Sequence, residues 1–565
     1  MQSYLQYRRL GQAVHRQLDH VGPRDVSASV TGSPAQDRQI ADVVGAAQTD
    51  QTSNVPESNP SPLAQSKTQH SEKTALGYSL AGIDVQRQIE PGDSTSHLFI
   101  VGWEDETDPL NPQNFSFARR LVATLLVSAL GFIVGAASSI PSGVMSQNIE
   151  AFGVSEVVGS LVIGLYLLGF ATGSLVSGPL SEIVGRNAVY AGSLTLFMIF
   201  VMASGLAPNI GAQLAFRFLA GIFGCPALTC AGGTIADLWN PLEKTIMFPL
   251  YAILSFGGPV LGPVIASYMG QTGVLSWRWS EWIILIGSGA ILALIILFQP
   301  ETYSPLLLKW KGKHFRKATG DPRFRSEMDT AKVPLVNRIA GALKRQFLIT
   351  VHEPIILLIS LYMTVLYIVL FTFFDGYAYI FTDTYGIAQG LTNIIWVAMY
   401  IGIALAGLLV PFIYRGTKKA FTQAVQMDQD SSPDVTNPGL WIRRTSSQKS
   451  GSDFPSISIW SPILASTLFG LGTICVFISS YMYVIDSYDI YAASALGFMT
   501  VSRYCAAGGM TVVGVPFYKN MGVHWTLTIL GCISALLVPV PYVFYRFGSV
   551  IRRWSRYAVA EDSKV

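Results

Sequence analysis

Residues 177–190 read SGPLSEIVGRNAVY, a short polar interruption between two long apolar stretches of chain. Its Glu182 and Arg186 are four residues apart, so on a helix they share one face or reach partners on a neighbouring helix end. Gly178 and Gly185 permit close backbone approach and a tight turn with positive φ. We therefore predict a turn between two membrane helices, with charges that form a latch in one conformation and release it in another.

The composition outside this stretch is that of a membrane protein. Half of the 565 residues are hydrophobic and only 13% are charged, against about 25% charged in ordinary globular proteins. Runs of roughly 20 apolar residues, the length that a helix needs to cross a bilayer, recur after residue 119. The chain is therefore predicted to be an all-α integral membrane protein, since a barrel would need alternating strands.

The same inspection argues against several functional classes. The formal net charge of +3 comes with no basic footprint for nucleic acid. The chain has no phosphate-binding loop of an ATP-driven pump and no Ser/His/Asp or metal-ligand spacing. We therefore expect no enzyme activity, no cofactor, no metal and no nucleic-acid partner, and an ion gradient as the energy source.

The apolar runs predict eleven membrane spans, six in a first half of the chain and five in a second half. The first six are 121–140, 157–180, 188–207, 212–236, 246–269 and 282–298. The other five are 354–374, 392–414, 459–486, 491–515 and 525–545.

The polar gap at 415–458 stands where a sixth span of the second half should be, because no window in it is apolar over the length of a crossing. The loop 300–352 holds eleven Lys or Arg against four Asp or Glu, so it belongs in the cytosol by the positive-inside rule. Three crossings, an odd number, follow the gap, so a chain that starts them in the cytosol would end outside. The basic C-terminal tail would then lie outside the cell, against the positive-inside rule. We interpret the gap as a missing ninth span, either a gene-model error or a real deletion.

These features divide the chain into five segments. Residues 21–74 are rich in Ser, Gln, Asp, Pro and Thr, which favours disorder, and the opening MQSYLQYRRLGQAV can form a short amphipathic helix. The segments are a disordered cytosolic tail at 1–101, a six-helix half at 102–299, a basic cytosolic loop at 300–352, a second helical half at 353–547 with the gap at 415–458, and a C-terminal tail at 548–565.

Three motifs carry a family resemblance. The segment GPLSEIVGR resembles the signature loop of the major facilitator superfamily, with Glu182 where the family pattern has Asp. The segment LAFRFLAGIFGCPALTCAGGTIADLW is similar to the family motif with a membrane-embedded arginine, here Arg217. The segment GGPVLGPVIASYMG resembles the antiporter motif of the drug:proton branch, at Gly258, Gly262 and Pro263. Over roughly residues 102–555 the chain resembles fungal twelve-span multidrug and polyamine exporters.

The resemblance implies two six-helix halves that rock about a central site. It implies proton-coupled export of small amphipathic molecules, such as drugs, toxins, secondary metabolites or polyamines, by a monomer in the cell membrane. The partners would be the substrate, protons and the lipid bilayer. Two alternatives remain open at this point: a proton-coupled uptake permease, and a receptor-like or defective paralogue that does not transport because of the missing span.

Buried charges supply the candidates for coupling. An arginine inside an apolar span costs about 2.5–3.5 kcal/mol, so Arg217 should face a cavity or a partner. Arg217 either takes part in proton coupling or is a fixed structural charge that is hydrogen-bonded to backbone carbonyls. Because arginine does not release its proton, coupling needs a nearby acid. Asp237, near the cytosolic end of the same span, is one candidate, and Arg503 in the eleventh span is a further coupling residue whose partner is unknown.

The outer end of the seventh span supplies candidates for the substrate cavity. Asp375, Tyr377 and Tyr379 cluster there, and aromatic side chains suit flat hydrophobic compounds. The alternative is that the acid is an interfacial charge and that the rings belong to an interfacial belt.

Overall fold

The structure, a computed structural model, describes residues 1–20, 80–89, 95–269, 275–330, 353–427, 459–488 and 492–543, with isolated positions between 337 and 350 and residue 546. These residues belong to two compact units. The larger unit comprises residues 116–302 and 333–565, and the smaller comprises residues 2–115 and 303–332.

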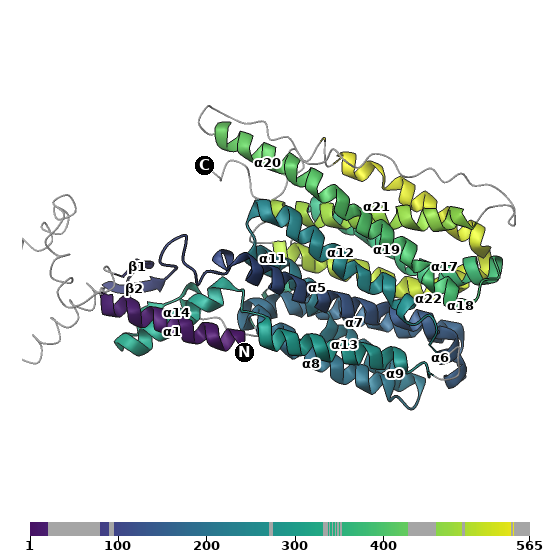
Figure 1. Cartoon of the computed structure of the whole chain (residues 1–565), viewed down its shortest axis with the longest axis horizontal. Helices are drawn as coiled ribbons and strands as arrows, with labels where there is room; N and C mark the ends of the chain where they lie inside the picture. Colours follow the sequence, from purple (N-terminus) through teal and green to yellow (C-terminus); the bar gives the residue numbers. More distant parts are fainter. Residues whose placement is uncertain are drawn as a thin grey trace, which may run out of the picture. The chain divides into compact units, whose positions relative to one another are not determined.

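The first half of the larger unit is a bundle of long helices that lie side by side (Figure 1). At the start of the fifth crossing, Asn240 and Glu243 form a capping box, with Pro241 in the first turn. The crossings are α5 (Phe117–Ser139) continued by η2 (Ile140–Val144) and α6 (Met145–Phe152), α7 (Glu156–Val184), α8 (Arg186–Gly205), α9 (Ile210–Gly224) continued by α10 (Pro226–Thr229) and α11 (Ala231–Leu238), α12 (Pro241–Ile265) and α13 (Trp279–Phe298).

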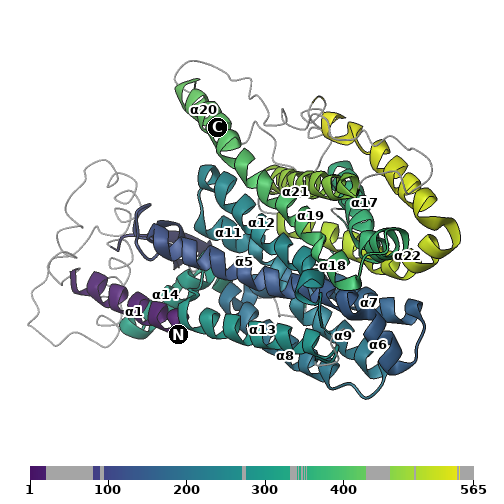
Figure 2. The ribbon, with the colours of Figure 1, turned by 45° about the vertical axis from the view of Figure 1, so that its right-hand side comes forward.

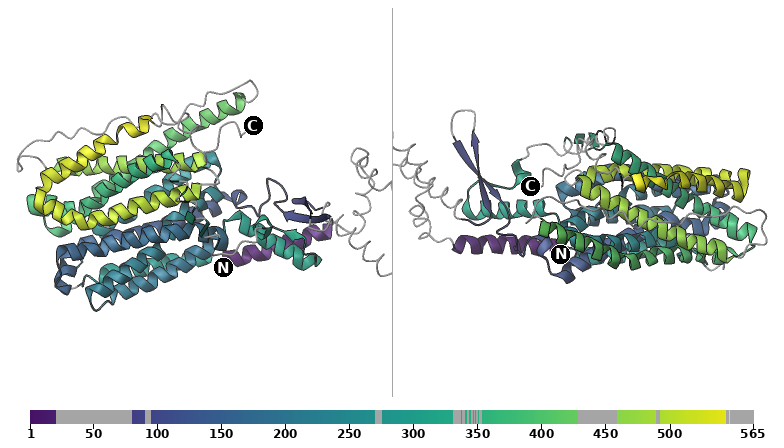
Figure 3. Two further views of the ribbon diagram at one scale, coloured as in Figure 1. Left: turned by 180° about the vertical axis from the view of Figure 1, so that it is seen from behind. Right: turned by 90° about the horizontal axis from the view of Figure 1, so that it is seen from above.

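The second half packs against the first through α22, which lies along α7, and through α19, which lies along α12. Its elements are α17 (Pro354–Tyr377), η3 (Ala378–Thr384), α18 (Gln389–Ile394), α19 (Trp396–Leu405), η4 (Ala406–Leu409), α20 (Val410–Met427), α21 (Trp460–Tyr488) and α22 (Ala492–Leu536). The helix α22 bends at Gly522, whose φ of 75° lies in the left-handed region that glycine adopts without steric cost. Figure 3 shows α22 turning back on itself there.

The predicted all-α membrane fold is confirmed. The described residues contain ten helices long and apolar enough to cross a membrane, one of which is the bent helix 495–543. Counting its two legs separately gives six crossings in the first half and five in the second, as the apolar runs predicted.

Hydrogen bonds fix the directions of the helices in the second half. The helices α17 and α21 are antiparallel, because Tyr377 near the end of α17 bonds Ser466 near the start of α21 at 2.7 Å. At the other end, the Tyr488 hydroxyl donates to Glu353 at 2.9 Å. From η3 the chain turns into α18, and α18, α19, η4 and α20 then run back as one continuous rod (Figure 2).

The helix α20 therefore ends at the end of the bundle where α17 begins, whereas α21 begins at the opposite end. The residues 428–458 between them lie outside the described residues. The first leg of α22 runs parallel to α17, since Ser502 pairs with Thr364 at 2.6 Å and Gly514 lies against Asp375. The second leg returns, so the last described crossing has the direction that the positive-inside rule favours. Parity predicted that the last three spans would run in the opposite directions and leave the C-terminal tail outside. The structure gives them the other orientation.

The smaller unit corrects one prediction. The N-terminal tail was expected to be disordered over residues 1–101, but α1 (Gln2–His20), β1 (Ile83–Ile89) and β2 (Thr95–Val101) are ordered elements; residues 21–79 lie outside the described residues. The reason is a shared apolar core that these elements build with later chain: Val14, Leu80, Phe99, Val101, Phe315 and Phe324.

The core brings the N-terminal segment together with the loop after the sixth span. The strands β1 and β2 are antiparallel, and β2 pairs in parallel with β3 (Phe324–Arg325). The helix α14 (Ser304–Thr319) packs on α1, and the short helices η1 (Pro112–Asn114) and α15 (Glu327–Thr330) complete the unit. The predicted segments 1–101 and 300–352 thus each contribute to one folded unit.

Lys311 ties α14 to the chain before the first crossing. Its side chain is 1% exposed, donates to the carbonyl of Gly102 at 3.1 Å and lies 3.8 and 4.0 Å from Glu104 and Asp108. Burial lowers the pKa of Lys311 from its ordinary value, and the two carboxylates oppose that change. The lysine is held as a buried, hydrogen-bonded group of the smaller unit.

The opposite ends of α20 and α21 give a direct prediction of topology. In a variant without the five native cysteines, Arg415→Cys in α20 should be shielded from a membrane-impermeant maleimide in intact cells. Ser461→Cys in α21 should be labelled, because it lies at the other membrane face. Both positions are exposed on the protein. Glu150→Cys is the external control, and labelling of all three sites after permeabilisation shows that each thiol is reactive. Equal labelling of 415 and 461 in intact cells would contradict the fold.

Candidate functional site

The turn between α7 and α8 holds the residues predicted to form a latch, and its arginine pairs with a different acid from the one predicted. Gly185 has a φ of 106°, the positive value expected of the turn. The Arg186 guanidinium donates from Nε to Asp237 Oδ2 at 3.2 Å and from Nη1 to Ser181 Oγ at 2.5 Å. Glu182 makes no ion pair within the part of the chain that the structure describes. The latch acid is therefore Asp237, which the sequence suggested for proton coupling.

Glu301 completes the latch and was missed in the sequence. Its carboxylate accepts the backbone N–H groups of Arg186 at 3.0 Å and Asn187 at 3.2 Å. A carboxylate at the start of α8 is favoured by the helix dipole and by the free N–H groups there. The sequence feature that could have pointed to Glu301 is the Pro-Glu-Thr segment directly after the sixth span, because it carries an acid. Gly178 lies inside α7 with open space beside its Cα, so it makes no close backbone approach.

Arg217 lies inside the first half and is 1% exposed. Its Nη1 donates to the carbonyl of Ala137 in α5 at 2.7 Å, and its Nη2 forms an ion pair with Glu281 in α13. Its guanidinium carbon is 6.0 Å from the centre of the Tyr166 ring. The carbonyl contact is the one that a structural charge would make, and Glu281 is the acid that coupling would need.

Glu281 is also 1% exposed and was not predicted as a site residue. Its Oε1 accepts from Arg217 and from Ser204 of α8 at 3.1 Å, and its Oε2 has no hydrogen-bond partner among the residues that the structure describes. The apolar run of the sixth span begins at residue 282, which left Glu281 in the flanking loop. The structure begins α13 at Trp279, so Glu281 occupies the first helical turn, a position that favours an acid.

The predicted antiporter motif packs α12 on α5. A Cβ on Gly258 would collide with the carbonyl of Phe132, and one on Gly262 would collide with the Ser139 side chain. The backbone at Pro263 lies beside Gly143. Small residues let the two helices approach closely, which is the packing role expected of this spacing.

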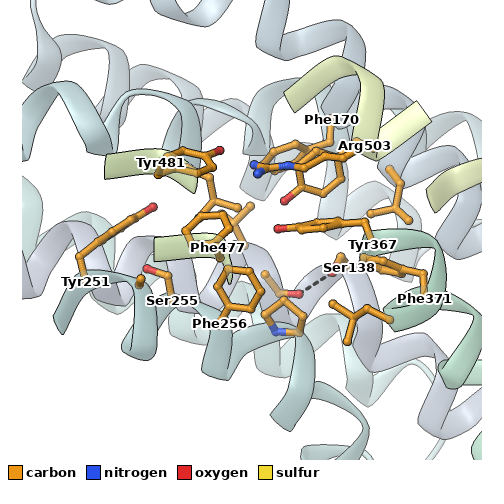
Figure 4. Close-up of a pocket in the computed structure, with 18 of the residues that line it drawn as sticks. Ser138, Phe170, Tyr251, Ser255, Phe256, Tyr367, Phe371, Phe477, Tyr481 and Arg503 are labelled. Carbon is orange, nitrogen blue, oxygen red and sulfur yellow. Dashed lines mark hydrogen bonds between the residues drawn. The ribbon is translucent and has the colours of Figure 1, made fainter. Parts of the chain in front are cut away.

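A small cavity lies in the larger unit, lined by residues of both halves (Figure 4). Its volume is about 40 Å³. The first half contributes α5, α7, α10 to α12, and the second half contributes α17, α21 and α22. The wall consists mainly of aromatic and small side chains, among them Ser138, Tyr166, Phe170, Phe248, Tyr251, Ser255, Phe256, Tyr367, Phe371, Phe477, Tyr481, Arg503 and Tyr504.

Arg503 is the charged residue of this wall and is 2% exposed. Figure 4 shows its guanidinium among the aromatic rings. Its guanidinium carbon lies 4.8 Å from the ring centre of Tyr367, 5.5 Å from Phe477, 5.2 Å from Tyr481 and 5.1 Å from Tyr504. These are cation–π distances. The sequence identified the arginine as buried, and the structure supplies these rings as its neighbours.

The three predicted cavity residues lie beyond this wall. Tyr377 stacks on Trp396 at 4.1 Å between ring centres, within the second half. Tyr379 is at the outer end, where its hydroxyl donates to Glu156 at 3.3 Å. Asp375 is buried, and its Oδ2 has no hydrogen-bond partner. None of the three belongs to the cavity lining.

Polar contacts join the two halves at this outer end. Lys519 of α22 pairs with Glu156 of α7 at 2.9 Å. Gln389 and Asn393 of the second half donate to the carbonyl of Gly143 at 3.0 and 3.3 Å. These bonds cross from one half to the other, so they must break if the outer ends of the halves separate.

Known proteins resemble the chain in sequence and in fold. The family described as the Major Facilitator Superfamily matches residues 127–425. The MFS-type transporter kojT of Aspergillus flavus is 46% identical over 84% of this chain and 85% of its own length. The uncharacterized transporter C530.02 of Schizosaccharomyces pombe is 34% identical over 83% and 87%. The solved structure of the proton:xylose symporter XylE covers 77% of this chain and 96% of its own, with a TM-score of 0.52 at 15% identity.

The Arg217–Glu281 pair predicts a non-additive stability effect. Arg217→Met and Glu281→Gln should each destabilise the protein by about 3–5 kcal/mol, because each leaves one buried group without its partner. The double variant should lose much less than the sum, since neither orphan charge remains. Thermal unfolding in detergent compares the stability of the purified parent protein, the two single variants and the double variant. Lys519→Gln, in a pair about half exposed, is the control and should cost less than about 1 kcal/mol. Additive losses at 217 and 281 would contradict the pairing.

Proposed function

Because the chain belongs to the major facilitator superfamily, we propose that it exports small amphipathic molecules by proton-coupled alternating access. The relatives and the fold are those of multi-pass membrane transporters and not of enzymes. The finer proposal is a drug:proton antiporter of the cell membrane that acts as a monomer. Its substrates would be drugs, toxins, secondary metabolites or polyamines.

The observation that carries the proposal is the central cavity, which residues of both halves line and which is small. A volume of about 40 Å³ is far below the ~300–1,000 Å³ of pockets that hold drug-sized ligands. A substrate therefore enters only if the halves move apart. The aromatic wall suits flat apolar compounds, and the contacts of Lys519 and Gln389 provide an outer gate that opening would break.

The proposed latch and the proposed outer gate lie at opposite ends of the bundle, so each would hold a different end closed. Arg186 with Asp237 lies at the end where α11 finishes and α12 begins, whereas Lys519 with Glu156 lies at the other end. Alternating access needs elements that hold one end closed while the other opens. The direction of the α21 and α22 crossings supports two halves of matching topology, which a rocking mechanism requires.

Proton coupling is proposed to use Glu281. Its Oε2 has no hydrogen-bond partner although the side chain is buried, so it offers a place for a proton. Protonation would neutralise the acid and weaken its bond to Arg217, which stays charged. The ion pair joins α9 to α13, with Ser204 of α8 and Ala137 of α5 also bonded to it. A change of its charge would therefore act on four helices of the first half.

Expression in a yeast without its own drug pumps should raise tolerance to at least one hydrophobic toxicant. Glu281→Gln and Arg217→Ala should abolish that tolerance while the protein remains in the membrane. Glu150→Gln, at an exposed acid, is the control and should behave as the parent protein. In proteoliposomes, Glu281→Gln should still exchange labelled toxicant across the membrane without a gradient but should not accumulate it against one. Proton-driven accumulation by Glu281→Gln would contradict the assignment of the acid, and net import of the toxicant would contradict export.

The latch predicts a difference between two neighbouring acids. Asp237→Asn should slow toxicant export by about tenfold, or ~1.4 kcal/mol in the barrier, because Arg186 loses its charged partner. Glu182→Gln should export nearly as fast as the parent protein, since Glu182 makes no ion pair among the described residues. Initial rates in proteoliposomes at matched protein density measure both. The reverse order of the two variants would restore Glu182 as the latch acid.

A further inference from the structure

We propose that the central cavity takes planar organic anions and that Arg503 selects them. The inference rests on the proposed transport function, because it assigns a substrate class to the cavity described above. Its basis is a buried positive charge that lines the cavity and that, among the residues the structure describes, has no acidic partner.

The hydrogen bonds of Arg503 are few for a buried arginine. Among the described residues, its Nε and Nη1 meet no partner by geometry, and its side-chain hydrogen bonds go to neutral hydroxyls, those of Thr500 at 3.5 Å and of Tyr481. Within the described residues no carboxylate lies at ion-pair distance from it. The contrast with Arg186 and Arg217 is direct, because each of those buried arginines is paired with a carboxylate.

The aromatic rings stabilise the charge without neutralising it. Cation–π contacts contribute about 0.5–2 kcal/mol each. Within the described part of the chain, the Nε and Nη1 groups keep N–H donors that no acceptor uses. A buried ion without a counter-ion costs several kcal/mol, so its persistence in an apolar site marks a functional position. We infer that the absent partner of Arg503 is the substrate.

The geometry points to one chemical class. A guanidinium donates two parallel N–H groups to the two oxygens of a carboxylate, with strength that neutral groups do not match. The rings of Phe477, Tyr481 and Tyr504 suit a flat ring attached to such an anion. A cation is repelled by Arg503, which excludes polyamines from the proposed substrate classes. Acidic aromatic or enolic toxins and metabolites remain.

Three probes of one shape and different charge test the inference. Benzoate, benzamide and benzamidinium share a flat ring and carry one negative charge, none and one positive charge at pH 7. Binding of labelled benzoate to the full chain in lipid nanodiscs, with the other two as competitors, measures the preference. We expect benzoate to bind about tenfold or more tightly than benzamide, as a charge-assisted pair implies, and benzamidinium to bind most weakly.

Variants assign the preference to the arginine. Arg503→Gln should lower benzoate affinity by about tenfold or more and leave benzamide affinity nearly unchanged. Arg503→Lys keeps the charge and should keep the order of the three probes, which maintains the test if the glutamine variant does not fold. Arg415→Gln removes the charge of an exposed arginine of α20 that does not line the cavity, and it is the matched control, with the parent preference retained.

Equal binding of benzoate and benzamide by the parent protein, or no benzoate binding, would overturn the inference. So would a benzoate preference that Arg503→Gln leaves intact, because the anion would then bind elsewhere. Either result leaves the transport proposal standing if the yeast and proteoliposome assays show export of a neutral toxicant. Failure of export for every toxicant, with anion binding retained, would instead overturn the transporter proposal and keep Arg503 as an anion site.

Discussion

The cost of a positive charge in an apolar bundle organises this structure. A membrane interior offers no water to solvate a guanidinium, so each buried arginine must find a partner within the protein or face a cavity. Arg186 is held by Asp237 and Ser181, and Arg217 by Glu281 and a backbone carbonyl. Arg503 is surrounded by aromatic rings instead. The three solutions correspond to the three roles that we propose: a latch, a coupling pair and a ligand site.

Helix packing follows from a different constraint, the close approach of backbones where side chains are absent. A Cβ on Gly169 would collide with the carbonyl of Phe218, and a Cβ on Gly402 with that of Thr467. Such contacts join helices within one half. Between the halves, the outer contacts are polar side chains such as Lys519 and Gln389. The halves also approach closely at Gly164 of α7 and Gly508 of α22, so the proposed rocking motion would break polar bonds at the outer end and change a close helix contact between the halves.

The sequence predicted the features that depend on local pattern. Apolar run length predicted the crossings, and Gly185 predicted the turn with positive φ. The cost of a buried charge predicted that Arg217 needs a partner, but the partner itself was not predictable. Glu281 is distant in sequence, and it precedes the apolar run that marks its helix. The same limit explains the smaller unit, because β2 pairs with β3 across more than 200 residues and only tertiary contact orders the N-terminal segment.

The coupling pair and the cavity share a wall, which gives a physical route between them. Tyr166 lines the cavity, its hydroxyl donates to the carbonyl of Val134 at 2.9 Å, and its ring faces Arg217. The carbonyl that binds Arg217 belongs to Ala137, directly beside the cavity residue Ser138. Neutralising Glu281 would release Arg217 from one of its two bonded partners and change the potential at Tyr166 and α5. An anion on Arg503 lies across the same small cavity. Proton and substrate would therefore act on one shared segment, α5 with Tyr166, and either one can bias its position.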